Sequence, residues 1–347
     1  MQTITYRGPD DLAVVDRPVP TASASEALVE VAALGICGSD LLLWSGGFER
    51  VTPPVVVGHE FSGTVVAAVE GFPAGSRVVV EPLLNCGVCA PCRRGDENVC
   101  VRLRLLGIDV DGGAAPFVVA PVHRLHAIPD TLDLQHAALA EPTAVAVHMW
   151  ERSGAQPSDS IFIAGGGPIG ALVASVARAK GAARIVVSEP NPSRRALLER
   201  LGFEVLDPIG GSLGELLGSL DAGADGFDVA FELTGVGAGL QSAIEAVRVQ
   251  GTVLLGGIPH DDPPFPGARA VLKELEIRGA RTYRSSNVEE AIRLLAVGAV
   301  DPSIITRVVP LERGVSDAFE ALRSARDEMK ILVDVSSSHP DRTDRQR

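Results

Sequence analysis

The 347-residue chain has only five cysteines, few aromatic residues and no long uninterrupted apolar run. Its longest uncharged stretch, residues 160–177, is broken by three successive glycines and a proline, so it does not predict a transmembrane helix. The N-terminus lacks the basic and apolar regions of a signal peptide. From these absences we expect a cytoplasmic protein with no membrane partner.

Basic residues are also scarce, because 31 Lys and Arg stand against 44 Asp and Glu and give a formal net charge of -13. This charge repels a phosphate backbone, and no basic stripe interleaved with aromatic residues counters it. We therefore expect no nucleic-acid partner. The length suits two domains, each with its own core.

The pattern of apolar residues changes near residue 158. Before it, short β-type runs alternate with Gly and Pro, as in Ala27–Ala33, Gly63–Val69 and Arg77–Glu81. After it, apolar strands alternate with helical patterns, which is typical of a parallel sheet with helices on its faces. We predict an α/β protein in which residues 1–143 and 284–347 form a β-rich catalytic domain and residues 144–283 form a doubly wound domain.

Four cysteines cluster in the loop 86–100, with the spacing Cys-x2-Cys-x2-Cys-x7-Cys. This spacing lets one short loop surround a tetrahedral zinc ion and leaves no position for substrate. The expected structural zinc ligands are Cys86, Cys89, Cys92 and Cys100. Two disulfides, an iron–sulfur cluster and a nucleic-acid-binding zinc finger are the weaker alternatives.

The fifth cysteine, Cys37, lies in GICGSD, and His59 and Glu60 follow in GHEFSG. A thiolate, an imidazole and a carboxylate make a good zinc site with one position open for water or substrate. Glu141, in LAEPTAVAVH, stands at the predicted domain boundary. From the residues alone, the favoured interpretation of Glu141 is an acidic residue at the start of a helix opened by Pro142.

A glycine turn follows the apolar strand SIFIAG and opens a helix. Gly165, Gly167 and Gly170 have the order Gly-x-Gly-x-x-Gly, with Pro168 and Ile169 between them. Glu189 ends the next strand, where a dinucleotide-binding fold places an acid against the ribose hydroxyls.

The acid at Glu189 favours NAD over NADP. Arg194 and Arg195 favour NADP instead, because a basic pair there could hold a 2′-phosphate.

Together, GICGSD, GHEFSG, the four-cysteine loop, AEPTAVAVH, GGGPIG and VVSEP resemble the zinc-dependent medium-chain dehydrogenase/reductase family, in its polyol, 2,3-butanediol and threonine dehydrogenase branch. The resemblance implies a GroES-like catalytic domain, a Rossmann domain and a homodimer or homotetramer. It implies two zinc ions per chain, the catalytic one held by Cys37, His59 and either Glu60 or Glu141. It also implies that Ser39 takes the alcohol proton and that Lys330 lies near the pyrophosphate.

The implied reaction is oxidation of a secondary alcohol, of diol or polyol type, by hydride transfer to NAD, with the ketone as product. Leu42 replaces the family's proton-relay histidine, and Leu43 replaces a frequent polar aromatic residue, so we expect a more apolar pocket to which Tyr283 and Arg284 could add polar contacts. Two alternatives remain: a dehydrogenase dedicated to a biosynthetic aminocyclitol or sugar intermediate, and a cofactor-binding protein with impaired catalysis.

Overall fold

The computed structural model describes residues 1–211, 226–324 and 327–336. The chain forms two compact units: unit 1 comprises Met1–Glu141, Arg284–Ala296 and Ile305–Arg347, and unit 2 comprises Pro142–Tyr283 and Val297–Ile304. The sequence-based bounds differ from this division at residues 142–143 and 297–304. In the part of the chain that the structure describes, no helix is long and apolar enough to cross a membrane.

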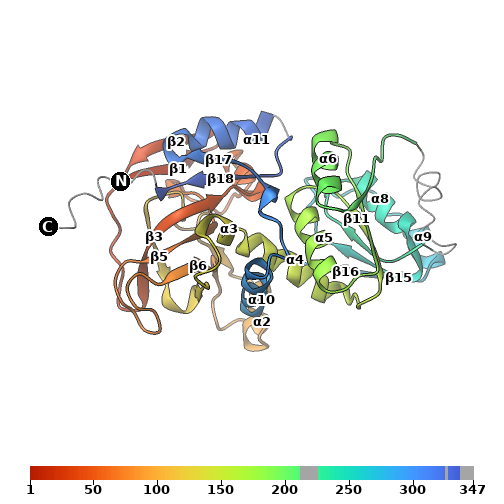
Figure 1. Ribbon diagram of the computed structural model, residues 1–347, viewed down its shortest axis with the longest axis horizontal. Helices are drawn as coiled ribbons and strands as arrows, with labels where there is room; N and C mark the ends of the chain where they lie inside the picture. Colours follow the sequence, from red (N-terminus) through yellow and green to blue (C-terminus); the bar gives the residue numbers. More distant parts are fainter. Residues whose placement is uncertain (212–225, 325–326, 337–347) are drawn as a thin grey trace. The chain divides into compact units, whose positions relative to one another are not determined.

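Unit 1 is built mainly from short strands (Figure 1). They are β1 (Gln2–Gly8), β2 (Asp11–Asp16), β3 (Glu26–Gly35), β4 (Val55–Val56), β5 (Glu60–Val65), β6 (Arg77–Val80), β7 (Leu83–Leu84), β8 (Arg104–Leu105), β9 (Phe117–Pro121), β10 (Leu125–Ala127), β17 (Ile305–Pro310) and β18 (Lys330–Asp334). Its helices are α1 (Gly38–Trp44), α2 (Ala90–Arg93), α3 (Leu134–Ala137), α10 (Ser285–Ala296) and α11 (Glu320–Ser324), and α4 (Ala140–Ser153) begins there.

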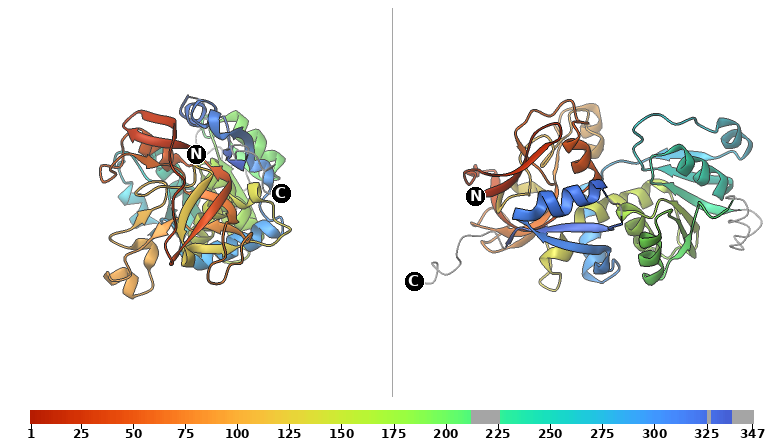
Figure 2. Two further views of the ribbon diagram at one scale, coloured as in Figure 1. Left: turned by 90° about the vertical axis from the view of Figure 1, so that its left-hand side faces the viewer. Right: turned by 90° about the horizontal axis from the view of Figure 1, so that it is seen from above.

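The main sheet of unit 1 has the order β10-β6-β5-β3-β18-β17, and β9 also pairs with β3. Over its first seven residues the central strand β3 alternates partly buried and buried side chains, which is the period of two expected of a strand with one face on a core. Its partners come from both ends of the chain, and the views in Figures 1 and 2 show the C-terminal strands in blue beside the N-terminal strands in red.

Unit 2 is a six-stranded sheet with the order β13-β12-β11-β14-β15-β16. Its strands, all paired in parallel, are β11 (Ser160–Ala164), β12 (Arg184–Ser188), β13 (Glu204–Leu206), β14 (Phe227–Glu232), β15 (Val247–Leu255) and β16 (Glu276–Gly279). The connecting helices include α5 (Pro168–Ala179) and α6 (Pro192–Arg200) on one face, and α8 (Gly237–Ala246) and α9 (Gly267–Leu272) on the other (Figure 1). The strand order reverses between β11 and β14, the switch point at which such sheets bind ligands.

The α/β prediction, with a β-rich part and a doubly wound parallel sheet, is therefore confirmed. One helix is displaced from its predicted position. The pattern Leu240–Val249 predicts a helix, but α8 begins three residues earlier, at Gly237, and ends at Ala246, and strand β15 begins at Val247. Val247 pairs with Phe227 of β14, and its β-branched side chain suits a strand better than a helix.

Candidate active site

Three of the predicted ligands lie close together, at the end of β3 and the start of β5. Cys37 is the N-cap of α1, immediately beyond β3, and His59 and Glu60 lie at the start of β5. One ligand atom from each of these three residues lies within 4.8 Å of the others. Gly35 pairs directly with Glu60 across the two strands, and a Cβ at Gly35 would collide with the Glu60 carboxylate. The strand pairing thus brings the three side chains together.

Asp40 belongs to this cluster, although the sequence analysis did not single it out. Its side chain is fully buried, and Oδ2 accepts a hydrogen bond of 2.8 Å from the backbone N–H of Cys37. Its other oxygen faces His59 Nδ1 at 3.1 Å. A carboxylate at Nδ1 fixes the ring so that Nε2 can face a metal ion. The available signal was Asp40 at the third position of a helix whose N-cap is Cys37.

The imidazole of His59 is buried and strongly influenced by Asp40. Burial alone would lower the pKa of His59, but the charge and the hydrogen bond of Asp40 outweigh burial and raise that pKa well above the ordinary value. Ser39 Oγ lies 3.2 Å from His59 Nε2, within hydrogen-bond distance. The negative charge of Asp40 therefore favours a positive charge at Nε2. In the metal-free protein that charge is a proton, and a metal ion could bind at Nε2 in its place.

Lys330 points into the same cluster from β18. Its ammonium forms a buried ion pair with the Glu60 carboxylate and donates a hydrogen bond of 2.9 Å to the carbonyl of Ile36. Burial alone would lower the pKa of Lys330, but the charges of Glu60, Cys37 and Glu141 outweigh it, and the pKa is raised. The sequence suggested a place near the pyrophosphate for Lys330, and gave no sign of this contact with Glu60.

The donor set fits zinc. A thiolate, an imidazole and a carboxylate are all common zinc ligands, and the ring of His59 already has the orienting carboxylate that zinc-bound histidines usually have. Glu60 is the glutamate in the cluster with Cys37 and His59, whereas Glu141 lies in the first turn of α4 and acts on Lys330 through its charge. Cys37, His59 and Glu60 would hold the ion.

The second cysteine cluster forms a separate lobe around α2. The sulfur atoms of its four predicted ligands lie within 4.8 Å of one another, and all four thiols are free. Backbone N–H groups of Cys92 and Val101 lower the pKa of Cys89 to about 6, whereas burial raises the pKa of Cys100 to about 11. Four converging sulfurs without disulfides fit a closed structural zinc site.

A buried ion pair anchors this lobe. The guanidinium of Arg124 pairs with the carboxylate of Glu81, and both side chains are at least 95% buried. Arg124 also donates to the side chain of Asn85, whose amide donates to Cys92 Sγ at 3.7 Å. His126 and Arg124 favour the charged form of Glu81 and, despite burial, keep its pKa below the usual value. The lobe is thus tied to the sheet through charged side chains.

In unit 2, the glycine turn connects β11 to α5. Gly165 has φ +104°, a region that side chains disfavour, and a Cβ at Gly170 would overlap the Gly165 carbonyl. Gly167 is the N-cap of the 12-residue helix α5, which begins at Pro168 and continues through Ile169. The turn therefore leaves the N-terminus of α5 open to a pyrophosphate, so its residues fit a dinucleotide.

Glu189 follows β12 directly beside this turn. Its carboxylate accepts hydrogen bonds of 2.8 Å from the backbone N–H groups of Gly166 and Asn191. Arg194 lies in the first turn of α6, and its Nη1 is 3.5 Å from the position of a Cβ on Gly167. The structure thus brings together the predicted cofactor-binding residues of unit 2.

The residues expected to shape the substrate pocket, Leu42, Leu43, Tyr283 and Arg284, differ in their exposure and contacts. Leu43 is 1% exposed and belongs to the core of unit 1, whereas Leu42 is 39% exposed. Tyr283 is buried, and the guanidinium of Arg284 pairs with Asp96 of the lobe at 2.9 Å. Leu43 therefore does not supply an apolar pocket wall, and Arg284 is engaged by the lobe.

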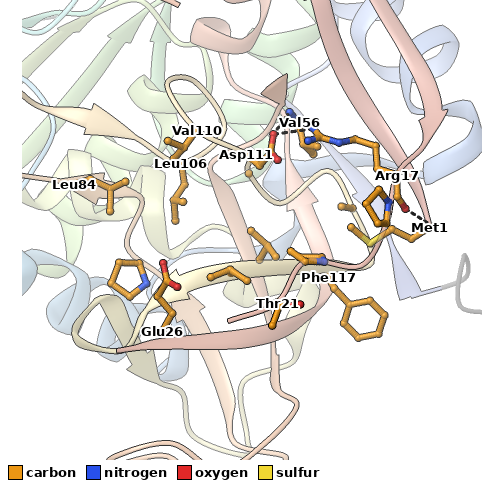
Figure 3. Close-up of a pocket in the computed structure, with 17 residues that line it drawn as sticks. Met1, Arg17, Thr21, Glu26, Val56, Leu84, Leu106, Val110, Asp111 and Phe117 are labelled. Carbon is orange, nitrogen blue, oxygen red and sulfur yellow. Dashed lines mark hydrogen bonds and ion pairs between the residues drawn. The ribbon is translucent and has the colours of Figure 1, made fainter. Parts of the chain in front are cut away.

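A cavity of about 480 Å³ lies in unit 1, and Figure 3 shows residues that line it, among them Met1, Val56 and Phe117. Its wall is largely apolar, and the ion pair between Arg17 and Asp111 stands at one side. None of the predicted site residues lines it. The cavity is thus separate from the Cys37 cluster.

Comparison with known proteins supports this description of the two units. Residues 23–130 match the family model of the alcohol dehydrogenase GroES-like domain, and residues 168–297 match the zinc-binding dehydrogenase model. The chain is 36% identical to 2-dehydro-3-deoxy-L-galactonate 5-dehydrogenase of Pseudoalteromonas atlantica, over 96% of this chain and 98% of that one.

Solved structures of dehydrogenases are also similar to this chain over nearly its whole length. A protein of Sinorhizobium meliloti assigned as a zinc-binding dehydrogenase and solved with NADP has a TM-score of 0.89 and 31% identity, with 96% and 98% of the chains covered. For 2R,3R-butanediol dehydrogenase of Bacillus subtilis, the TM-score is 0.88 and the identity 30%, with 96% and 99% covered. The chain therefore belongs to the zinc-dependent medium-chain dehydrogenase/reductase family of alcohol dehydrogenases, and is an oxidoreductase of its polyol dehydrogenase-like branch.

Proposed function

We propose that the enzyme oxidises a secondary alcohol of the diol or polyol type to the ketone, with NAD as hydride acceptor. The observation that carries this proposal is the cluster of Cys37, His59 and Glu60, whose imidazole is oriented by Asp40 and whose carboxylate is balanced by Lys330. Zinc bound there supplies a Lewis acid that favours loss of the alcohol proton.

The chain's own residues prepare the proton transfer. Ser39 Oγ, held near His59 Nε2, is placed to take the proton of the substrate hydroxyl. Leu42 offers no group to pass that proton on, so the next acceptor is solvent or a carboxylate such as Glu141. The acid at Glu189 supports NAD, because a carboxylate there binds ribose hydroxyls and repels a 2′-phosphate.

The diol or polyol class is supported by the similarity to butanediol dehydrogenase. A second candidate is a dehydrogenase dedicated to a sugar-derived intermediate. The similarity to a sugar-acid 5-dehydrogenase and the absence of the usual relay residue at Leu42 favour it.

We also place the enzyme in the cytoplasm as a homo-oligomer. Five free thiols suit a reducing compartment. Association through unit 2 is supported by β16 at the edge of the described sheet and by exposed apolar side chains nearby, such as Leu272 at 82% exposure. Gel filtration combined with light scattering should give a dimer or tetramer, and a monomer at micromolar concentration would contradict this.

The function is tested by following NADH formation with 2,3-butanediol, xylitol, sorbitol, threonine, 2-butanol and a sugar acid such as L-idonate. Cys37→Ala should abolish the rate and reduce the zinc content from two ions per chain to one. Ser39→Ala is the matched variant, because it should lower the rate while both zinc ions stay bound. A Cys37→Ala enzyme that keeps full activity would refute the proposed catalytic centre.

A further inference from the structure

Beside the glycine turn of unit 2 lies a basic side chain, Arg195, that is paired with an acid of the protein and not left for a phosphate of NADP. Arg195 is in the first helical turn after Glu189, where a guanidinium could hold the 2′-phosphate that distinguishes NADP from NAD. Its Nη2 forms an ion pair of 2.8 Å with Asp207 Oδ2. Its Nη1 donates to the carbonyls of Glu189 and Pro190 at 2.9 and 2.6 Å. The guanidinium is thus held at both terminal nitrogens, Nη1 and Nη2.

The fold brings Asp207 to this position. Asp207 follows strand β13, and the backbone N–H of Glu189 donates a 3.0 Å hydrogen bond to the carbonyl of Leu206, so the ends of β12 and β13 are joined. Asp207 Oδ1 accepts a hydrogen bond of 3.0 Å from the backbone N–H of Ile209. This contact orients the carboxylate and leaves Oδ2 facing Arg195.

The charges at this edge therefore favour a ribose without a phosphate. Glu189 has both carboxylate oxygens in hydrogen bonds with backbone N–H groups, which fix the position of the carboxylate. A 2′-phosphate would meet the charges of Glu189 and Asp207. Of the two arginines in this helical turn, Arg194 faces Gly167 of the glycine turn, and Arg195 is already engaged by Asp207. Without Asp207, Nη2 of Arg195 could turn to the phosphate while Nη1 stays on the carbonyls.

We propose that Asp207 is a specificity-determining residue of the cofactor site, and that it selects NAD by holding Arg195 away from the 2′-phosphate of NADP. This inference rests on the proposed NAD preference. In this inference Asp207 is a second acid, besides Glu189, that disfavours NADP, and it acts by holding Arg195.

The test is Asp207→Asn, which keeps the shape of the side chain and removes its charge. Dissociation constants of NAD and NADP are measured by titration calorimetry on the zinc-loaded enzyme, and kcat/KM is measured with both. The NADP/NAD ratio of affinities should rise about tenfold, the change that corresponds to about 1.4 kcal/mol. Asp207→Ser gives a second variant that still accepts a hydrogen bond from Ile209, should the first one fold poorly.

The matched control is Glu204→Gln. Glu204, in the edge strand β13, forms an ion pair of 2.7 Å with Arg184 of β12, so the control also removes the charge of an acid that pairs with an arginine. It should leave the ratio unchanged. In Asp207→Asn combined with Arg195→Gln, the gain for NADP should disappear, because the released guanidinium is its source.

Three results would overturn the inference. An NADP/NAD ratio that stays constant in both Asp207 variants of an NAD-preferring enzyme refutes the role of Asp207 alone. A gain for NADP that survives Arg195→Gln refutes the role of the ion pair. A wild-type enzyme that prefers NADP refutes the proposed NAD preference and, with it, this inference.

Discussion

Replacing Lys330 by Met tests the charge balance of the candidate metal centre. The change removes the only ammonium in contact with Glu60 within the described residues and leaves a carboxylate that is about 1% exposed. Breaking a buried ion pair costs about 3–5 kcal/mol, because the remaining charge is desolvated and unbalanced. The Ile36 carbonyl also loses a donor, which adds about 1 kcal/mol.

The size of this loss should depend on zinc. In the metal-free protein nothing replaces the ammonium, so the combined loss of about 4–6 kcal/mol should lower the melting temperature by roughly 8–24 °C, at about 2–4 °C per kcal/mol for a unit of this size. With zinc bound, the cation itself balances Glu60, and the loss should be clearly smaller. By linkage, folded Lys330→Met should then bind zinc more tightly than the wild type.

The assay is thermal unfolding followed by circular dichroism, for chelator-treated and zinc-saturated samples of both proteins. The contribution of the cysteine lobe is common to both and cancels in the comparison. Lys330→Arg is the control, because it keeps the charge and should lose much less stability. Equal losses in the metal-free and zinc-saturated states would refute the reasoning, since Lys330 and zinc would then not share Glu60.

Other predictions concern the lobe, the proton and the buried pair beside the lobe. Cys92→Ser should reduce bound zinc from two ions to one and lower the melting temperature, measured by atomic absorption and calorimetry, while Cys37→Ala should lose the same number of ions with far less effect on melting. Ser39→Ala should lower kcat about 10²–10⁴-fold with little change in KM, as expected for loss of one proton-transfer group, and a normal kcat would argue against it. Glu81→Gln should destabilise the protein by about 3–5 kcal/mol at pH 7, because Arg124 stays buried without its buried partner and keeps only the half-exposed carboxylate of Glu97. The folded-state pKa of Glu81 is lowered, so the stabilisation is present above the ordinary glutamate range and is lost as the pH falls through the folded-state value. Urea titrations at pH 7 and pH 4 should therefore show a smaller difference at pH 4, and an equal difference at both would contradict this.

The parts of the site that were predictable have local signals. The lobe cysteines, the pair His59 and Glu60, and the turn from Gly165 to Gly170 each occupy one short segment, where residue type and spacing carry the information. Asp40 also had such a signal, as the third residue of the helix capped by Cys37, but a single acid in a first helical turn is common.

The pairs that the sequence did not predict join distant segments. Lys330 reaches Glu60 only because β18 and β5 both pair with β3, and Arg195 meets Asp207 only because β12 and β13 are neighbours. Their partners depend on strand order and register, and no spacing in the chain encodes them. The same reason explains why the sequence pattern extended α8 past Ala246, since pairing with β14 decides where the strand begins.

The position of β18 beside β3 also affects how the protein is made. These two strands are separated by about 300 residues, and unit 2 lies between them in the chain. At about 5–20 residues per second, the ribosome needs roughly 15–60 s after β3 to synthesise β18. During that interval unit 2 can fold, whereas the end of β3 at residues 33–35, and the site that depends on Lys330, must wait for the last strand. A nascent chain released before β18 would therefore expose this end of β3, which makes early termination a route to aggregation.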